Sequence, residues 1–191
     1  KPAMRITGGR SKGRTLAAIP KGAPIRPTSD KVREAIFSIM GQHLTGLRVL
    51  DLFSGTGSLG LEALSRGAEF AAFIDHSRDS IGLIHRNLAR CGYQASAVIL
   101  KGDLKRGIPR GPLLNRERFH LVFLDPPYKC DGIPFVLQHP TLAKILAPGV
   151  RVVAETAKGV TLPERIGSLT RTDMRSYGDT QITLYRDKET I

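Results

Sequence analysis

The sequence contains no tryptophan, only two cysteines and no long apolar run. Cys91 and Cys130 form no Cys-x-x-Cys pair, which argues against a disulfide scaffold or a structural zinc site. Because no stretch of about 18 apolar residues occurs, we expect no transmembrane helix. No charged segment followed by an apolar leader opens the sequence, so we expect a cytosolic protein.

Acidic residues are also scarce. The 191 residues include 29 Lys and Arg against 17 Asp and Glu, a formal net charge of +12. More than half of this excess lies in residues 1–35, and a second basic cluster lies within residues 101–118. Such concentrated positive charge is typical of domains that bind a polyanion. We predict nucleic acid rather than a membrane surface, because no amphipathic basic helix with an aromatic face is visible.

The chain divides into a short basic segment and one domain. Residues 1–28 are rich in Gly, Pro and basic groups, which predicts an extended arm or small hairpin outside the core. Residues 29–191 form the predicted domain, which begins at a helix cap in Thr28-Ser29-Asp30. Apolar strand patterns occur at 47–53, 70–74, 97–100, 119–124 and 150–155, and helical patterns at 58–66, 77–90 and 133–146, the last interrupted near Pro140.

This alternation predicts an α/β, Rossmann-like fold. Strands separated by helices form a mostly parallel sheet with helices on both faces. Residues 167–187 alternate polar and apolar side chains, which predicts an antiparallel pair at the end. The polar clusters at 51–57, 75, 103 and 125–128 all follow predicted strands. They therefore lie at the carboxyl edge of the sheet, where open α/β sheets bind ligands.

The run Gly55-Thr56-Gly57-Ser58-Leu59-Gly60 fits G-x-G-x-x-G between a strand and a helix. This motif alone is a weak signal, shared by dinucleotide sites and others. Asp51 would face a pyrophosphate badly but suits a cationic group such as a sulfonium. Asp75 can bind ribose hydroxyls, and Asp103 can accept from an adenine amino group. Three acids around an adenosine favour S-adenosylmethionine over a nicotinamide dinucleotide. The predicted cofactor residues are Asp51, Phe53, Ser54, Gly55, Thr56, Gly57, Asp75, His76 and Asp103.

The tetrapeptide Asp125-Pro126-Pro127-Tyr128 is the most specific feature. An exocyclic amine on a base is a poor nucleophile, because its lone pair is delocalised into the ring. The Asp125 carboxylate and the Pro126 carbonyl can each accept one amino N–H and aim the lone pair at a methyl donor. Pro127 helps to fix the backbone, and Tyr128 offers a surface for a stacked base, worth about 1–3 kcal/mol. These four residues are the predicted catalytic set, and the chemistry needs no metal.

These motifs resemble those of a known family. The run from Val49 to Ser58 with the tetrapeptide resembles class I methyltransferases that act on exocyclic amines. Three further segments, Met4–Gly9 leading to Lys12-Gly13-Arg14, Arg26–Phe37 and Tyr177–Thr180, narrow the resemblance to the RsmD family of bacterial guanine-N2 methyltransferases of small-subunit ribosomal RNA. The resemblance covers residues 4–186. Its one departure at the cofactor site is Asp75, where glutamate is more often expected.

The resemblance implies a seven-stranded sheet ending in an antiparallel strand, bound S-adenosylmethionine, and the target guanine at residues 125–128. It also implies that the N-terminal extension faces RNA. We expect a monomer that acts on ribosomal RNA or on the assembling small subunit. The predicted RNA-binding residues are Arg5, Arg10, Lys12, Arg14, Arg26, Thr28 and Arg33.

Other functions are weighed against this one. A DNA adenine-N6 methyltransferase uses the same tetrapeptide, but the residues after Tyr128 are used up by the sheet and leave no target-reading domain. A methyltransferase acting on protein side-chain amides is disfavoured by Asp125 and by the basic arm. A non-catalytic RNA-binding protein would not need Asp125 or the adenosine-directed acids. A nicotinamide-dependent oxidoreductase is disfavoured by Asp51.

Overall fold

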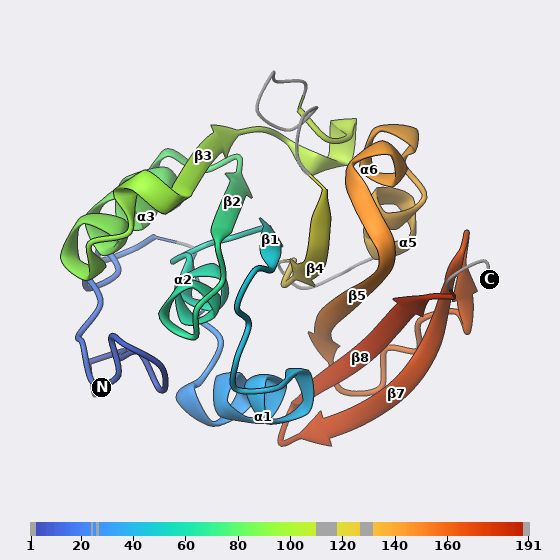
Figure 1. The fold of residues 1–191 in the computed structure, drawn as a ribbon, viewed down its shortest axis with the longest axis horizontal. Coiled ribbons are helices and arrows are strands. Elements are labelled where there is room, and N and C mark those ends of the chain that lie inside the picture. The colour runs from blue at the N-terminus through green and yellow to red at the C-terminus, as the bar shows by residue number, and fades with distance from the viewer. Residues whose placement is uncertain (1–2, 24, 26, 110–117, 127–131, 189–191) are drawn as a thin grey trace.

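The computed structural model describes residues 3–23, 25, 27–109, 118–126 and 132–188 (Figure 1). The helices are α1 (Asp30–Met40), α2 (Ser58–Ser65), α3 (Arg78–Cys91), α5 (Gly132–Leu137) and α6 (Pro140–Ile145), with short turns η1 (Gln94–Ser96) and η2 (Leu104–Arg106). The strands are β1 (Arg48–Leu52), β2 (Phe70–Asp75), β3 (Ala97–Lys101), β4 (Phe119–Leu124), β5 (Leu146–Ala157), β6 (Arg165–Ile166), β7 (Leu169–Tyr177) and β8 (Thr180–Asp187). No helix among these residues is long and apolar enough to cross a bilayer.

Over the described residues the strands form one sheet of order β3-β2-β1-β4-β5-β8-β7-β6. The first five strands in this order are parallel, and β8, β7 and β6 continue the sheet in antiparallel fashion. The Rossmann-like α/β fold and the antiparallel C-terminal pair are therefore confirmed. The predicted number of seven strands is wrong for this part of the chain, which has eight. The additional strand β6 has only two residues, too few to show a periodicity in sequence.

Local sequence signals set the helix ends. Ser29 caps α1, because its hydroxyl accepts from the Val32 amide, and Gly41 follows the helix with a positive φ of 98°, which glycine adopts readily. The helix that the cap at residues 28–30 opens therefore ends at Met40. The predicted interruption near Pro140 is confirmed, since α5 ends at Leu137 and Pro140 opens α6.

Alternate residues of the strands pack on the two faces of the sheet. Val49, Phe73 and Phe123 belong to the apolar cluster formed with α1, α2 and α3, and the ring of Phe123 meets Phe37 of α1 edge-on. Intervening strand residues such as Leu50 and Leu124 join a second cluster with α5 and α6. Figure 1 shows α2 and α3 on one side of the sheet and α5 and α6 on the other. Helices therefore cover both faces, as predicted.

The basic N-terminal segment forms a small hairpin. Arg5 and Thr15 pair as an antiparallel bridge, and the Leu16 amide donates to the Met4 carbonyl at 2.9 Å. Ile6 and Leu16 are 1% and 2% exposed and belong to the cluster of α1, α2 and α3. The hairpin is confirmed, but the expectation that it lies outside the core is wrong. One buried apolar side chain from each arm of the hairpin thus helps to anchor a sequence that is otherwise basic.

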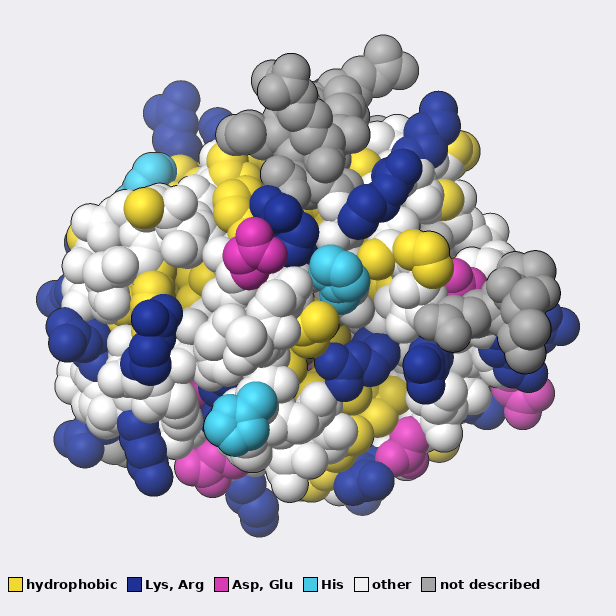
Figure 2. All heavy atoms as spheres, viewed as in Figure 1, with side chains coloured by type: hydrophobic (Ala, Val, Ile, Leu, Met, Phe, Trp, Pro, Cys, Tyr) yellow, Lys and Arg dark blue, Asp and Glu magenta, His cyan; other side chains and the backbone are white. Residues whose placement is uncertain are grey.

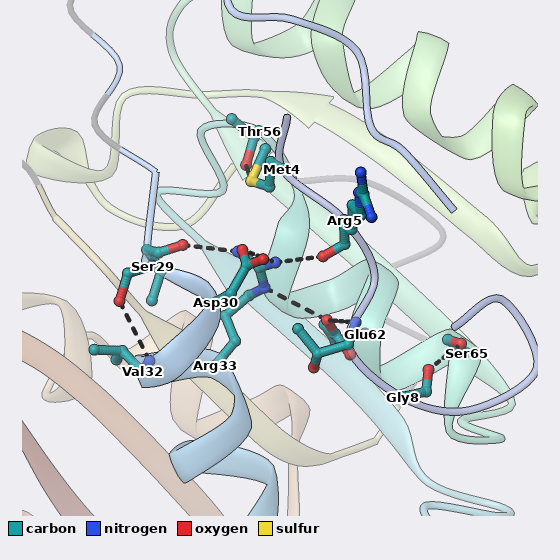
Figure 3. Close-up of polar contacts among 12 residues, drawn as sticks. Met4, Arg5, Gly8, Ser29, Asp30, Val32, Arg33, Thr56, Glu62 and Ser65 are labelled. Atoms are coloured by element: carbon teal, nitrogen blue, oxygen red, sulfur yellow. Dashed lines mark hydrogen bonds and ion pairs between the residues drawn. The ribbon is translucent and has the colours of Figure 1, made fainter. Parts of the chain in front are cut away.

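A buried arginine joins this hairpin to the domain. Arg33 of α1 has no exposed side-chain surface. Its guanidinium donates to the carbonyls of Arg5 at 2.5 Å and Thr28 at 2.7 Å, and to the Asp30 carboxylate at 2.8 Å (Figure 3). Its Nε lies 3.4 Å from Oε1 of Glu62 on α2. The guanidinium therefore bonds groups from four segments of the chain.

Glu62 is the other centre of this network. It is also fully buried, and its Oε1 accepts from the Thr7 amide of the hairpin at 2.6 Å. Its Oε2 lies 3.2 Å from Nη2 of Arg66, whose guanidinium stacks over the ring of Phe37. A buried ion pair is tolerated only when its remaining donors and acceptors find partners. Here the hairpin backbone supplies part of that set.

We predict that Ile6→Ala lowers the free energy of unfolding by about 2–5 kcal/mol, because it leaves a cavity in the main core. Denaturant unfolding of the whole chain measures this loss. Ile19→Ala is the matched control, since Ile19 lies in the same segment, is half-buried and belongs to neither apolar cluster. Equal losses in the two variants would mean that the hairpin is not part of the cooperative core.

Candidate functional site

A cavity of about 570 Å³ lies at the carboxyl ends of β1, β2, β4 and β5 and extends to the turn between β7 and β8. Its wall includes the carboxylates Asp51, Asp75, Asp125, Glu155 and Asp179. Among the described residues that line it, none is lysine or arginine. The described wall of the cavity is therefore acidic in a protein with a formal net charge of +12.

The strand periodicity explains why these acids converge. Val49, Phe73 and Phe123 face α1, α2 and α3, and Asp51, Asp75 and Asp125 each follow two positions later in the same strand or just beyond it. Side chains two positions apart point to the same face. The acids therefore lie on the same face of the sheet as the apolar residues, but at the edge of the sheet, beyond the part that the helices cover.

The glycine loop holds a strained backbone at the cavity wall. Phe53 adopts a positive φ of 59°, which is uncommon for a residue with a side chain, and Gly55 has φ 54°. Ser54 fixes this turn, since its hydroxyl donates to the Asp51 carbonyl at 2.6 Å and accepts from the Ile74 amide at 2.9 Å. The Gly55 amide donates to Oδ2 of Asp75 at 2.8 Å. The loop is thus tied to both neighbouring strands.

Asp51 is the most deeply buried acid of the cavity. It is 1% exposed, and its Oδ2 accepts from the Gly60 amide at 3.0 Å. Gly60 admits no larger residue, because the ring of Phe73 occupies the position of a side chain. Burial raises the pKa of Asp51 well above its ordinary value; the Gly60 bond opposes this rise, and the carboxylates of Asp125 and Asp75 add to it. A cation in the cavity would favour its charged form.

Asp75 and His76 lie at the next strand end. Oδ1 of Asp75 accepts from the Ser77 amide at 2.8 Å, and both carboxylate oxygens keep lone pairs for further donors. His76 is exposed at the rim, with its Nδ1 3.7 Å from Oδ1 of Asp75. Seven of the nine predicted cofactor residues line the cavity: Asp51, Phe53, Ser54, Gly55, Thr56, Asp75 and His76.

The two remaining predicted cofactor residues are not among the lining residues. Gly57 precedes α2 as its N-cap residue, in a left-handed conformation with φ 75°. Asp103 caps η2, where its carboxylate accepts from the Lys105 amide at 3.1 Å. A contact between Asp103 and a bound adenine stays a prediction.

Asp125 faces the cavity from the end of β4. Its Oδ2 accepts a hydrogen bond of 2.8 Å from the hydroxyl of Thr28, which is 5% exposed and also lines the cavity. Pro126 lies beside them in the wall. Pro127 and Tyr128 of the predicted catalytic set lie outside the described residues, as does Arg26 of the predicted RNA-binding set.

The hairpin presents the remaining predicted RNA-binding residues. Arg5, Arg10, Lys12 and Arg14 are all exposed. The guanidinium of Arg10 lies 5.6 Å from the ring centroid of Tyr93, and Arg14 donates to the Arg90 carbonyl at 2.5 Å. Arg33 differs from these four, because its buried guanidinium has no surface to offer a ligand. The predicted RNA contact of Arg33 therefore does not fit the structure.

Several lining residues were not predicted as site residues. Glu155 and Thr156 lie near the end of β5, and Tyr177, Asp179 and Thr180 lie at the turn between β7 and β8. The rule applied to the other strands, an acid at the carboxyl end, also identifies Glu155. The turn comes from the antiparallel part of the sheet, to which that rule does not apply. Among the described residues no group of three or more His, Cys, Asp or Glu side chains could hold a metal ion.

Asp51→Asn tests the electrostatic cost of the acidic cavity. Because the pKa of Asp51 is raised in the folded chain, ionisation of its carboxyl group destabilises the fold. The stability contributed by the neutral carboxyl group is complete below the pKa that Asp51 has in the unfolded chain. It is lost as the pH rises through the pKa that Asp51 has in the folded chain. Asparagine keeps an oxygen for the Gly60 amide but does not titrate. We expect the ligand-free variant to melt at a higher temperature than the wild type near about pH 8, and this advantage to vanish near about pH 4.

Thermal unfolding at both pH values measures this difference. Asp79→Asn, at an exposed site in the first turn of α3, is the control and should show no such pH-dependent gain. An advantage of Asp51→Asn that is the same at both pH values would contradict the assignment.

Comparison with known proteins places the chain in a family. Residues 4–186 match the family model described as "Conserved hypothetical protein 95". The chain is 37% identical over 185 residues to "Putative rRNA methyltransferase YlbH" of Bacillus subtilis, covering 97% of this chain and all of that protein. It is 35% identical over 126 residues to "Ribosomal RNA small subunit methyltransferase D" of Escherichia coli, covering 66% of this chain and 61% of that protein.

A solved structure agrees over the full length. "Putative methyltransferase yhhF from Escherichia coli" superposes with a TM-score of 0.80 at 27% identity, covering 99% of this chain and all of that one. The match of the family model extends over the same residues, 4–186, as the resemblance seen in the sequence motifs. The chain therefore belongs to the family of conserved hypothetical protein 95, which is the RsmD family.

Proposed function

We propose that the protein transfers a methyl group from S-adenosylmethionine to the exocyclic N2 amine of a guanine in small-subunit ribosomal RNA. The observation that carries this proposal is the acidic cavity in a basic protein. Carboxylates favour a sulfonium and amino groups that donate hydrogen bonds, and they repel phosphate. A cavity of this kind suits a cationic methyl donor and an amine, with the phosphate backbone of the nucleic acid outside it.

The residues present fit S-adenosylmethionine, which supplies a methyl group on a positively charged sulfur. Asp51 would hold the cationic part of the ligand, because a cation offsets the cost of its buried charge. Asp75, at the end of the neighbouring strand, can accept from the ribose hydroxyls. The strained backbone at Phe53 and Gly55 lets the loop between them approach the ligand closely.

Asp125 and Pro126 would prepare the target amine. In this proposal the carboxylate and the carbonyl each accept one N–H, so that the nitrogen lone pair points toward the methyl group. The new N–C bond forms as the C–S bond breaks, and sulfur keeps the electron pair of that bond. The positive charge that develops on nitrogen is stabilised by the two acceptors until a proton leaves.

The charge distribution also supports a nucleic-acid partner. The exposed basic residues of the hairpin lie outside the cavity wall, and Figure 2 shows Lys and Arg side chains projecting from the side where the hairpin and α3 lie in Figure 1. A base inside a stack cannot place its amine against Asp125 in the cavity wall, so this proposal requires that the guanine be extruded. The hairpin would hold the phosphates while the base enters.

The relatives narrow the substrate class. Two curated relatives carry names that specify ribosomal RNA methylation, and one of them specifies the small subunit. Guanine as the base and N2 as the methylated atom come from the resemblance of residues 125–128 and the accompanying motifs to the RsmD family. Product analysis is therefore the decisive experiment.

We predict that Asp125→Ala lowers methyl transfer at least about 100-fold, because it removes the acceptor that orients the amine. Its affinity for S-adenosylmethionine should change little. Labelled methyl transfer to small ribosomal subunits, naked ribosomal RNA, duplex DNA and protein, followed by nucleoside analysis, measures the rate and identifies the product. N2-methylguanosine in RNA is the expected product.

Asp79→Ala provides the matched control, since it removes an exposed acid of α3 outside the cavity. Label in N6-methyladenine would replace this proposal with a DNA adenine methyltransferase. Full activity of Asp125→Ala would refute the role of its carboxylate.

Reversing the charge of the hairpin should weaken RNA binding. For the variant with Arg10, Lys12 and Arg14 all changed to Glu, we expect the plot of log affinity against log salt to lose about 0.7–0.9 in slope for each phosphate contact removed. Binding titrations with a ribosomal RNA fragment at several salt concentrations measure the slope. The same change at three exposed residues outside the hairpin is the control for net charge: Lys158 in the turn after β5, Arg165 in β6 and Lys188 after β8.

A further inference from the structure

We propose that Thr28 is a positioning residue for Asp125, and that the buried Arg33 holds Thr28 in place for this task. This inference rests on the proposed function, because it concerns the carboxylate assigned there to the target amine. It also replaces the role in RNA contact that the sequence predicts for Thr28 and Arg33.

The first contact is the hydrogen bond between the two side chains. The Thr28 hydroxyl donates to Oδ2 of Asp125 at 2.8 Å, although the two residues are 97 positions apart in the chain. A carboxylate has a second oxygen and further lone pairs. The bond to Oδ2 restricts the rotation of the carboxylate, and a carboxylate oxygen that accepts one bond can still accept a second from a substrate amine. Thr28 is 5% exposed and lines the same cavity, so its hydroxyl reaches Asp125 from a largely buried position.

The second contact holds the threonine itself. Thr28 precedes the N-cap of α1 and lies in no helix or strand of its own. Its carbonyl accepts from Nη1 of Arg33 at 2.7 Å, and the Arg33 amide donates to the Ser29 carbonyl at 3.0 Å. Because Arg33 is fully buried and bonded to other segments, it cannot rotate away without breaking several bonds.

The number and placement of the acceptors around residue 33 explain why this residue is an arginine. Its guanidinium is planar and presents five N–H donors in a fixed arrangement, which allows it to bond several acceptors at once. In Figure 3 the bonds of Arg33 extend to Arg5 in the hairpin, Asp30 in α1 and Glu62 in α2. The same side chain thus sets the hairpin and the loop that carries the Thr28 hydroxyl.

Thr28→Val tests the proposal, since valine keeps the size and β-branching of threonine but has no hydroxyl. Under single-turnover conditions, with saturating S-adenosylmethionine and small ribosomal subunits lacking the modification, we expect methyl transfer to slow about 10- to 100-fold. The affinity for S-adenosylmethionine should stay within about 2-fold of the wild type, and Thr28→Ser should recover most of the rate because it restores the donor.

Thr183→Val is the matched control. Thr183 of β8 is fully buried, its hydroxyl has no hydrogen-bond partner among the described residues, and it does not line the cavity. The same chemical change there should leave the rate near that of the wild type. If Thr28→Val were as active as Thr183→Val, the positioning role would be overturned while the proposed function stood. If the wild type transferred no methyl group to RNA, both would be overturned.

A second measurement does not depend on the substrate. The donated hydroxyl favours the ionised carboxylate, so in the ligand-free chain Thr28→Val should move the NMR titration of the Asp125 carboxyl carbon to higher pH. Among the described residues that line the cavity, the other titratable groups are Asp51, Asp75, His76, Glu155, Tyr177 and Asp179, and these remain in both variants. Thr183→Val should not move this titration. An unmoved titration in Thr28→Val would overturn the proposed hydrogen-bond role even if the variant were slow.

Discussion

The buried ion pair between Arg33 and Glu62 is the interaction on which the rest of the structure depends. Both side chains are fully shielded from water, and an ion pair of this kind survives only if nearly every donor and acceptor is satisfied. The structure supplies hydrogen-bond partners for the pair from the hairpin, from α1 and from α2. Each side chain has a second ion pair, Arg33 with Asp30 and Glu62 with Arg66, so removing either charge would disturb the whole buried cluster. The hairpin is therefore part of the fold and not an appendage.

The acidic cavity follows from two simple rules of sheet geometry. Parallel strands bring their carboxyl ends to one edge, and alternate residues share one face. Asp51, Asp75 and Asp125 obey both rules, so carboxylates gather where the covering helices end. The ligand-free chain bears an electrostatic cost for this, which the raised pKa of Asp51 reflects. A cation that binds there gains affinity by relieving that cost.

The sequence predicts the parallel part of the fold and the edge that bears the cavity, because both depend on local signals. Strand periodicity, capping residues and acids after strands are visible within a few positions, and they locate Asp51, Asp75 and Asp125 correctly at the cavity. Arg33 is different, since a basic residue in the first turn of a helix resembles an exposed one. Its burial depends on Glu62 and on the hairpin backbone, which no local pattern reveals. The strand β6 is missed for another reason, since its two residues are too few to show a periodicity.

The exposed side chains of the hairpin and its backbone differ in how freely they can change, and this difference limits how the protein can change its RNA target. Its exposed arginines and lysine can be exchanged at little cost to folding, because surface substitutions usually change stability by less than about 0.5 kcal/mol. The backbone of the hairpin cannot change in the same way, because the Arg5 carbonyl and the Thr7 amide bond the buried Arg33 and Glu62 side chains. A hairpin transplanted from a distant relative would have to reproduce those two bonds before it could read a new sequence. Divergence in RNA recognition is thus expected in side chains, on a hairpin of constant length and register.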